Sequence, residues 1–407
     1  MEEKVTNRWI MVYAALVMQL CLGILYSYSV LRGPLMKEVG YTVKEAGYPF
    51  IASLFFFAVG MIAAGRWQDK AGPRTVGIFG GVLLAIGAAV AGVMYKSLGG
   101  LIFGYGILGG LGVGFAYVTP IATCIKWFPD KRGTITGLAV FGFGAGTLIF
   151  APLLGKLVAS SGIATTLYIV AAIMLICVCG SAAIFKAPPA GYKPAGWNPP
   201  QPAAGAQVVK ANYTPEEIIK TGSFWVLWLI YFLGAAGGLM IIGQAVPIGV
   251  EVAHLDKAVA AGGLGIMSLF NGLGRLVFGS ISDKLGRAKT VMIMFVIYII
   301  CFVFVVPNGT NFIVYVVGLS AIGFAYGGWL ALMPSMTADY FGTKSLGANY
   351  AYLFTAWGVA GIGGPYMIDA IKTATGGFTY AMYVTAVTSV IGIFLCAIIK
   401  PPKAENA

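Results

Sequence analysis

An arginine inside an apolar run is the residue best placed to bind a ligand. Arg275 lies eight residues before Asp283, which ends the run. At 1.5 Å per residue this is about 12 Å from the helix end, near the middle of a hydrocarbon core about 30 Å thick. All fourteen acidic residues lie at the ends of apolar runs, in loops or in tails. A buried guanidinium keeps its proton and costs at least about 2.5–3.5 kcal/mol, so it needs water, backbone carbonyls or an anionic ligand.

A carboxylate is the ligand that we favour, because it accepts two parallel hydrogen bonds from a planar guanidinium. Asn271 lies one turn earlier on the same helix face, and its amide suits a hydroxyl or carbonyl group beside the carboxylate. Two alternatives remain for the arginine: it bonds only to helix carbonyls, or it extends to the cytoplasmic face. For Asn271 the alternative is packing or a hydrogen bond between helices.

Three aromatic residues, Tyr117, Phe143 and Tyr326, reach a similar depth in their own runs. They are too deep for the aromatic belt at the membrane interface. An aromatic wall with few polar groups fits a small, partly apolar ligand, although each residue alone is also explained by packing.

The composition predicts a membrane protein, because 59% of the 407 residues are hydrophobic and only 10% are charged. Soluble domains carry about 25% charged residues. The apolar runs are about 20 residues long, as a transmembrane helix requires. We therefore expect an all-α membrane protein with twelve transmembrane helices in two pseudo-symmetric six-helix bundles. The predicted helices are 9–31, 45–65, 75–95, 99–125, 134–158, 163–186, 222–249, 257–282, 288–307, 310–338, 344–370 and 376–399.

The domain organisation follows from this spacing: an N-terminal bundle over 1–186, a proline-rich cytoplasmic linker over 187–221 and a C-terminal bundle over 222–407. Thr214-Pro215-Glu216-Glu217 predicts the start of a short helix within the linker. Lys and Arg concentrate on the side of both termini, which predicts that termini and linker are cytoplasmic. The net charge of +12 lies in short loops without interleaved aromatics, so we expect no nucleic-acid partner.

The two halves contain repeated motifs. Gly65, Asp69-Lys70 and Gly72 recur in the second half as Gly279, Asp283-Lys284 and Gly286, all at one constant offset along the chain. Such an offset indicates parallel repeats related by an axis along the membrane normal. Both loops resemble the signature loop of the major facilitator superfamily, which implies that fold and a latching role for the aspartates.

Within that superfamily the chain resembles the bacterial oxalate:formate antiporters and the monocarboxylate porters. The resemblance rests on Asn7-Arg8-Trp9, on the run from Trp127 to Gly133 and on the run from Phe270 to Arg275. It implies that Arg275 binds the substrate carboxylate and that Tyr26, Tyr117 and Tyr326 surround the substrate. Leu25 stands where the antiporter has a pocket glutamine.

Two departures bear on the substrate and its coupling. Trp357 replaces the antiporter's second buried cation, and a single positive charge balances one carboxylate better than a dianion. Animal monocarboxylate porters have an Asp one turn before the arginine, where this chain has Asn271. The sequence therefore does not identify the group that carries the proton. His254 and Asp256 lie near the outer mouth, where they either take part in proton coupling or are solvated loop residues.

We expect a secondary active transporter of lactate-like or pyruvate-like monocarboxylates that works by proton symport and alternating access. The alternative is exchange of organic anions. An enzyme would need a nucleophile–base pair or metal ligands at midplane depth, and the sequence places neither there. The expected partners are the substrate, a co-transported proton and the lipid bilayer, with no prosthetic group. We expect a monomer in the inner membrane of a bacterium.

Overall fold

The computed structural model describes residues 7–42, 44–189, 191–197 and 212–402. All of its regular elements in these ranges are helices, which confirms the predicted fold class. Part of the predicted linker, including Pro199, Pro200, Pro202 and Lys210, lies outside the described residues.

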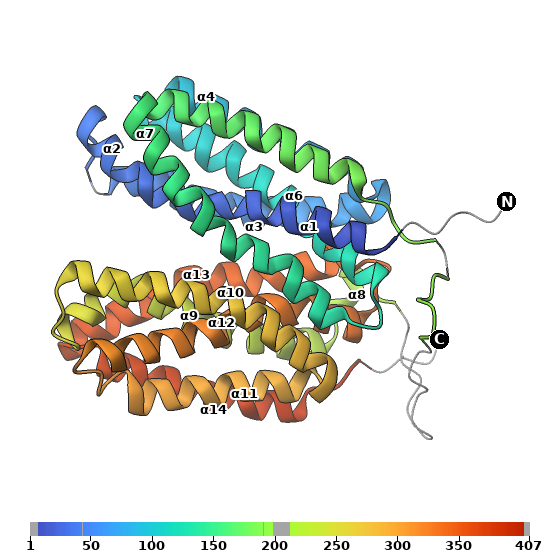
Figure 1. Ribbon diagram of the computed structural model, residues 1–407. Helices are drawn as coiled ribbons and strands as arrows, with labels where there is room; N and C mark the ends of the chain where they lie inside the picture. Colours follow the sequence, from blue (N-terminus) through green and yellow to red (C-terminus); the bar gives the residue numbers. More distant parts are fainter. Residues whose placement is uncertain (1–6, 43, 190, 198–211, 403–407) are drawn as a thin grey trace. The chain divides into compact units, whose positions relative to one another are not determined.

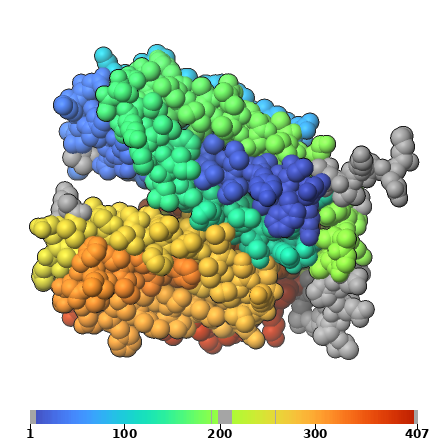
Figure 2. Space-filling view, in the orientation of Figure 1, coloured from blue at the N-terminus to red at the C-terminus, as the bar shows by residue number. Residues whose placement is uncertain are grey.

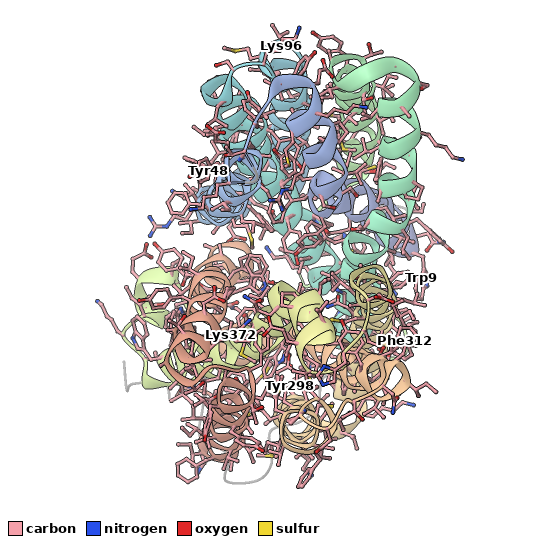
Figure 3. All side chains as sticks on the ribbon, turned by 90° about the vertical axis from the view of Figure 1, so that its left-hand side faces the viewer. Trp9, Tyr48, Lys96, Tyr298, Phe312 and Lys372 are labelled. Atoms are coloured by element: carbon pink, nitrogen blue, oxygen red, sulfur yellow. The ribbon has the colours of Figure 1, made fainter. Side chains whose placement is uncertain are left out.

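The chain forms two compact units. Unit 1 comprises Met1–Asp130, Ala139–Pro200 and Thr343–Tyr352, and unit 2 comprises Lys131–Leu138, Gln201–Gly342 and Leu353–Ala407. Each is a bundle of helices, as the view along their axes in Figure 3 shows. The predicted bundle boundaries at residues 187 and 222 stay a prediction.

Most elements of unit 1 follow one another along the chain (Figure 1). They are α1 (Trp9–Leu22), the 3₁₀-helix η1 (Gly23–Tyr28), α2 (Ser29–Val39), η2 (Glu45–Gly47), α3 (Tyr48–Ala71), α4 (Pro73–Met94), α5 (Leu98–Leu101), the π-helix η3 (Ile102–Gly109), α6 (Gly110–Trp127) and, from Ala139 onward, α7 (Arg132–Ile184). The segment α7 holds two of the predicted helices, because Gly162 (φ 77°) breaks it into two arms.

Unit 2 contains the first turns of α7 and all the later helices except the start of α13. These are α8 (Pro215–Ile218), α9 (Gly222–Glu251), α10 (Lys257–Leu285), α11 (Arg287–Ile300), the π-helix η4 (Cys301–Val305), α12 (Phe312–Phe341), α13 (Leu346–Thr375) and α14 (Thr379–Ile398). The predicted short helix in the linker is α8. Its capping box joins the Thr214 amide to Glu217 Oε2 at 2.7 Å.

Ten helical segments of the described chain are long and apolar enough to cross a bilayer. One of them is α7, whose two arms correspond to two predicted helices, and the 30-residue α13 is outside the ten. Each of the twelve predicted segments is therefore helical.

The internal repeat reappears in the turns between helices. Gly72 between α3 and α4 has φ 83°, and Gly286 between α10 and α11 has φ 87°. Side chains other than glycine rarely adopt this conformation, so the repeated glycine is explained by the turn it makes.

The repeat also fixes how helices pack inside each unit. In unit 1 a Cβ at Gly60 would come within 2.7 Å of the Leu111 carbonyl oxygen, and one at Gly114 would overlap the Phe57 carbonyl. In unit 2 a Cβ at Gly274 would overlap the Phe324 carbonyl, and one at Gly327 the Asn271 carbonyl. The pairs α3–α6 and α10–α12 therefore meet backbone to backbone through equivalent glycines. Small residues allow this close packing in membrane proteins.

Candidate functional site

The predicted arginine lies inside unit 2. Arg275 is 2% exposed and Asn271 is 8% exposed. Arg275 Nε and Nη2 donate hydrogen bonds to Asn271 Oδ1 at 3.2 and 3.0 Å. The amide is neutral, so these bonds orient the guanidinium without cancelling its charge. Sequence reasoning placed both residues on one face and assigned the Asn271 amide to a group beside the substrate carboxylate, but it did not predict the bond between Asn271 and Arg275.

The glycines of α10 and α12 hold this pair in place. Gly327 lets α12 approach the Asn271 carbonyl of α10, and Tyr326 directly precedes Gly327 in the chain. Tyr326 is 3% exposed. A Cβ at Gly238 of α9 would overlap the Tyr326 ring, so this ring also fills the space left by a glycine on a third helix.

Trp357 of α13 bonds to Tyr326. Its indole Nε1 donates to Tyr326 Oη at 2.8 Å, and both groups are buried. The Trp357 ring stacks on Phe354 with a centroid distance of 4.9 Å and an interplanar angle of 22°. Trp357 is therefore held by a hydrogen bond and a stacked ring.

Unit 1 gathers four aromatic rings. Phe143 of α7 makes edge contacts with Tyr26 of η1 and Tyr117 of α6, at centroid distances of 5.2 and 5.1 Å. Phe57 of α3 packs edge-on against Tyr117 at 5.1 Å and lies 6.2 Å from Phe143. The structure thus brings together the three aromatic residues that the sequence assigned to this half, and adds Phe57.

Sequence reasoning missed Phe57 because three phenylalanines follow one another from Phe55. The internal repeat would have pointed to Phe57. At the offset that relates the two signature loops, Phe57 corresponds to Asn271 and Met61 corresponds to Arg275. The same turn of the equivalent helix therefore carries two apolar side chains in unit 1.

Leu25 lies in a different environment from the four rings. It lines a small apolar cavity of about 30 Å³ inside unit 1, together with Leu84, Val113 and Leu154. A cavity of this size and polarity stays dry or holds at most about one water molecule. The neighbouring Tyr105 donates a hydrogen bond to the Leu25 carbonyl at 3.3 Å, which gives a partner to a backbone group of the 3₁₀ segment.

A buried amide of α1 was also missed by sequence reasoning. Gln19 is fully buried, and its Nε2 donates to the Tyr117 carbonyl at 3.3 Å. Its Oε1 has no hydrogen-bond partner among the described residues. The signal was present, since Gln19 is the polar residue within the apolar run of α1.

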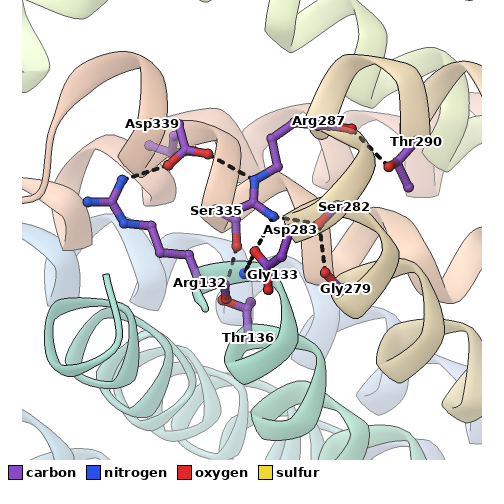
Figure 4. A network of polar contacts seen from close by, with 12 residues as sticks. Arg132, Gly133, Thr136, Gly279, Ser282, Asp283, Arg287, Thr290, Ser335 and Asp339 are labelled. Atoms are coloured by element: carbon purple, nitrogen blue, oxygen red, sulfur yellow. Dashed lines mark hydrogen bonds and ion pairs between the residues drawn. The ribbon is translucent and has the colours of Figure 1, made fainter. Parts of the chain in front are cut away.

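The second signature loop ends in a network of charges (Figure 4). Asp283 accepts hydrogen bonds from the backbone amides of Gly133 and Thr134 at 2.9 and 2.7 Å. It also pairs with Arg287 at 2.7 Å. A carboxylate at the start of α7 is stabilised by the free amides and the dipole of that helix.

The network continues from Arg287 through Asp339. Arg287 Nε lies 2.9 Å from Asp339 Oδ2, and Arg132 Nη1 lies 2.6 Å from Asp339 Oδ1. Two arginines and two aspartates therefore alternate at this end of unit 2.

The first signature loop has a simpler arrangement in unit 1. Asp69 accepts a hydrogen bond from the Ala348 amide at the start of α13, at 3.0 Å, and lies 3.3 Å from Lys126 Nζ. The two aspartates thus cap different helices in the same manner. His254 and Asp256 are exposed in the loop between α9 and α10, outside both clusters.

The helical units, their bilayer-length apolar segments and a buried charge at mid-helix depth define a polytopic membrane protein with an arginine in its interior. The family model for the Major Facilitator Superfamily matches residues 11–365 and 265–407. The chain belongs to this superfamily of transporters.

Two relatives and one solved structure illustrate this kinship. The oxalate:formate antiporter of Oxalobacter formigenes is 32% identical over 399 residues, which cover 97% of this chain and 92% of that protein. The apicoplast pyruvate carrier 1 of Toxoplasma gondii is 25% identical over 423 residues, covering 89% of this chain and 77% of that protein. The crystal structure of the fucose:proton symporter of E. coli matches with a TM-score of 0.70 at 14% identity, covering 97% of this chain and 100% of that one. This last likeness shows the fold.

Proposed function

We propose that this chain is a secondary active transporter of small monocarboxylates such as lactate or pyruvate, coupled to protons by symport. The observation that carries the proposal is the buried Arg275, whose neutral neighbour Asn271 orients it without cancelling its positive charge. A monocarboxylate balances one such charge, whereas a dianion leaves an excess negative charge in a medium of low dielectric constant.

Each predicted site residue has a role in this proposal. Arg275 binds the carboxylate, and the Asn271 amide nitrogen donates to the α-hydroxyl or α-carbonyl oxygen while its oxygen holds the arginine. Tyr26, Tyr117, Phe143 and Tyr326 supply apolar surface for the small alkyl part. Leu25 supplies apolar surface next to Tyr26 in the chain, where the resemblance implies a glutamine in the antiporter.

The relatives support carboxylate transport in two ways. The oxalate:formate antiporter is named for organic anions, and the pyruvate carrier for a monocarboxylate. In the present chain Trp357 is bonded to Tyr326 at the position where the antiporter resemblance implies a lysine. The absence of a second cation at this position supports a monocarboxylate, and not a dicarboxylate, as the substrate of this member of the family.

Transport in this proposal proceeds by exposing the site alternately to the two sides of the membrane. The substrate enters as an anion together with a proton, so net charge transfer is zero. The lysines and arginines on the side of the termini favour a cytoplasmic location for both termini in a bacterial inner membrane. We propose that the functional unit is the monomer.

Proteoliposomes test the coupling. We expect labelled lactate to accumulate inside the vesicles when the external medium is made more acidic than the interior, without any internal counter-anion. Accumulation that requires an internal counter-anion such as formate and ignores the pH step would instead support organic-anion exchange, the second candidate function.

The substrate class is tested on the purified protein by thermal unfolding. Ligands stabilise the folded state that binds them. We expect lactate and pyruvate to raise the midpoint of unfolding more than oxalate at equal concentration, and this difference to disappear in Arg275→Lys. A larger rise with oxalate would contradict the monocarboxylate assignment.

A further inference from the structure

A groove runs along the outside of unit 1, away from the buried residues of the candidate site. It lies between α1 and the second arm of α7 and has a volume of about 390 Å³. Figure 2 shows the dark blue atoms of α1 beside the light green atoms of that arm. Its lining residues include Ile10, Tyr13 and Val17 of α1 and Ile176, Gly180 and Ile184 of α7.

The groove is open to the outside of the unit, and its lining combines small residues with large apolar ones. Ala14, Gly180 and Ser181 line it, and a Cβ at Gly180 would meet no atom within 4 Å. Tyr13 and Ile176 are 68% and 71% exposed. In a chain that spans a bilayer, such an apolar and exposed face lies against acyl chains.

One end of the groove is marked by the ends of both helices. α1 begins at Trp9 and α7 ends at Ile184, and both Ile184 and the neighbouring Ile10 line the same groove. Trp9 is 41% exposed. An exposed tryptophan at a helix end is typical of the membrane–water interface, so this end of the groove lies at headgroup level.

Positive charge collects at this end. Lys186 follows α7 and is exposed, while its carbonyl accepts a hydrogen bond from Trp127 Nε1 at 2.7 Å. The Tyr192 ring contacts Trp127 at 4.9 Å, which brings the exposed Lys193 to the same neighbourhood. The carboxylate nearby, Asp130, is paired with Arg8 at 2.6 Å.

We propose that this groove binds a phospholipid with an anionic headgroup. One acyl chain lies in the groove between Tyr13 and Ile176, and the phosphate and anionic headgroup lie against Lys186 and Lys193. Since Arg8 and Asp130 neutralise each other, the two lysines add positive charge here among the residues that the structure describes. Basic residues near a membrane surface attract anionic lipids by about fivefold in affinity each. The site is separate from the transport site, so the proposal does not depend on which substrate is carried.

The test uses the full-length protein in detergent, titrated with phosphatidylglycerol or phosphatidylcholine of identical acyl chains. Native mass spectrometry counts the bound lipids. We expect retention of phosphatidylglycerol over phosphatidylcholine, and a loss of about tenfold or more in its affinity for the double variant Lys186→Gln/Lys193→Gln. Lys156→Gln, an exposed lysine near the opposite end of unit 1, is the matched control and should leave the affinity unchanged.

The acyl part is tested separately by filling the groove. Gly180→Leu should fold normally, because its side chain enters open space, and should weaken binding of both lipids. Thr165→Leu places the same side chain at an exposed position near the start of the same arm, outside the groove, and should have no effect.

Three outcomes would overturn the proposal. The first is equal retention of the two lipids, and the second is unchanged phosphatidylglycerol affinity in the double lysine variant. The third is a stable dimer that Gly180→Leu dissociates in the absence of any lipid effect, because a second copy of this chain would then occupy the groove.

Discussion

Helices α3 and α6 of unit 1 and helices α10 and α12 of unit 2 share their glycine contacts but not their chemistry. Gly60 and Gly114 in one unit, and Gly274 and Gly327 in the other, bring equivalent backbones together. The turn that carries Asn271 and Arg275 in α10 carries Phe57 and Met61 in α3. The glycines thus determine how the helices pack in both units, whereas other residues determine whether the equivalent turn is polar or apolar.

The signature loops repeat this contrast. Arg287 of the second loop corresponds to Pro73 of the first, at the offset that relates Asp283 to Asp69. Arg287 joins Asp283 to Asp339, whereas Asp69 has Lys126 at 3.3 Å. One substitution within a repeated loop therefore distinguishes a four-residue charge network from a single ion pair.

The largest effect is expected where the two repeats differ by a charge. Arg275→Lys should reduce uptake of a monocarboxylate by about 30-fold or more, because a point charge does not replace the two parallel hydrogen bonds of a guanidinium, worth about 2 kcal/mol. Initial rates in proteoliposomes measure this. The control is Met61→Leu at the equivalent position of α3, which should transport normally. Near-normal uptake by Arg275→Lys would reject it as the carboxylate ligand.

A smaller effect is expected for the residue one turn away. Asn271→Leu should reduce uptake by about tenfold, since it removes both hydrogen bonds that orient Arg275, at about 0.5–1.5 kcal/mol each. Phe57→Leu at the equivalent turn keeps an apolar contact and should change uptake by about twofold at most. Equal losses in the two variants would show that the turn acts through packing in both repeats.

Selectivity should change when a second charge is added. Trp357→Lys should improve competition by oxalate against labelled lactate by about fivefold, because a second cation balances a dianion. Trp357→Phe separates the loss of the indole from the gain of charge and should leave the preference unchanged. An oxalate preference that is the same in all three proteins would count against charge matching.

The smallest effects are expected in stability and concern the loops. Asp283→Asn should lower the free energy of unfolding by about 1–3 kcal/mol, since Arg287 then loses the charge of Asp283 and keeps its bonds to Asp339 and Ser282. Asp69→Asn should cost less than about 1 kcal/mol, because its ion pair with Lys126 is longer, at 3.3 Å, and the Lys126 side chain is 24% exposed. Thermal unfolding of the two variants side by side measures the difference. A greater loss for Asp69→Asn would reverse our ranking of the two loops.

The helices could be predicted because their signal is local. A bilayer requires about 20 apolar residues for each span, and turn glycines such as Gly72 and Gly286 mark where the chain reverses. Arg275 could also be found in this way, since its depth follows from counting residues to the helix end. Gly162 lies between two predicted helices, so the break in α7 is equally a local feature.

Other features depend on partners that are distant in the chain. The hydrogen bond from Arg275 to Asn271 Oδ1 depends on the conformations of both side chains. The contact of Phe57 with Tyr117 needs the packing of α3 on α6, and Trp357 finds Tyr326 across two helices. The 3₁₀ turn at Gly23–Tyr28 likewise depends on neighbours, because Tyr105 and Thr147 donate to the carbonyls of Leu25 and Gly23. Apolar runs alone do not specify such pairs.

Neither compact unit is an unbroken stretch of polypeptide. Lys131–Leu138 belongs to unit 2, although the chain before and after it belongs to unit 1. Thr343–Tyr352 belongs to unit 1, although it is synthesised after most of unit 2. Domains usually fold in the order in which the ribosome releases them. Here unit 1 lacks its segment Thr343–Tyr352 until translation is nearly finished. If the chain were expressed as two fragments divided in the linker, each fragment would lack a segment of its own unit.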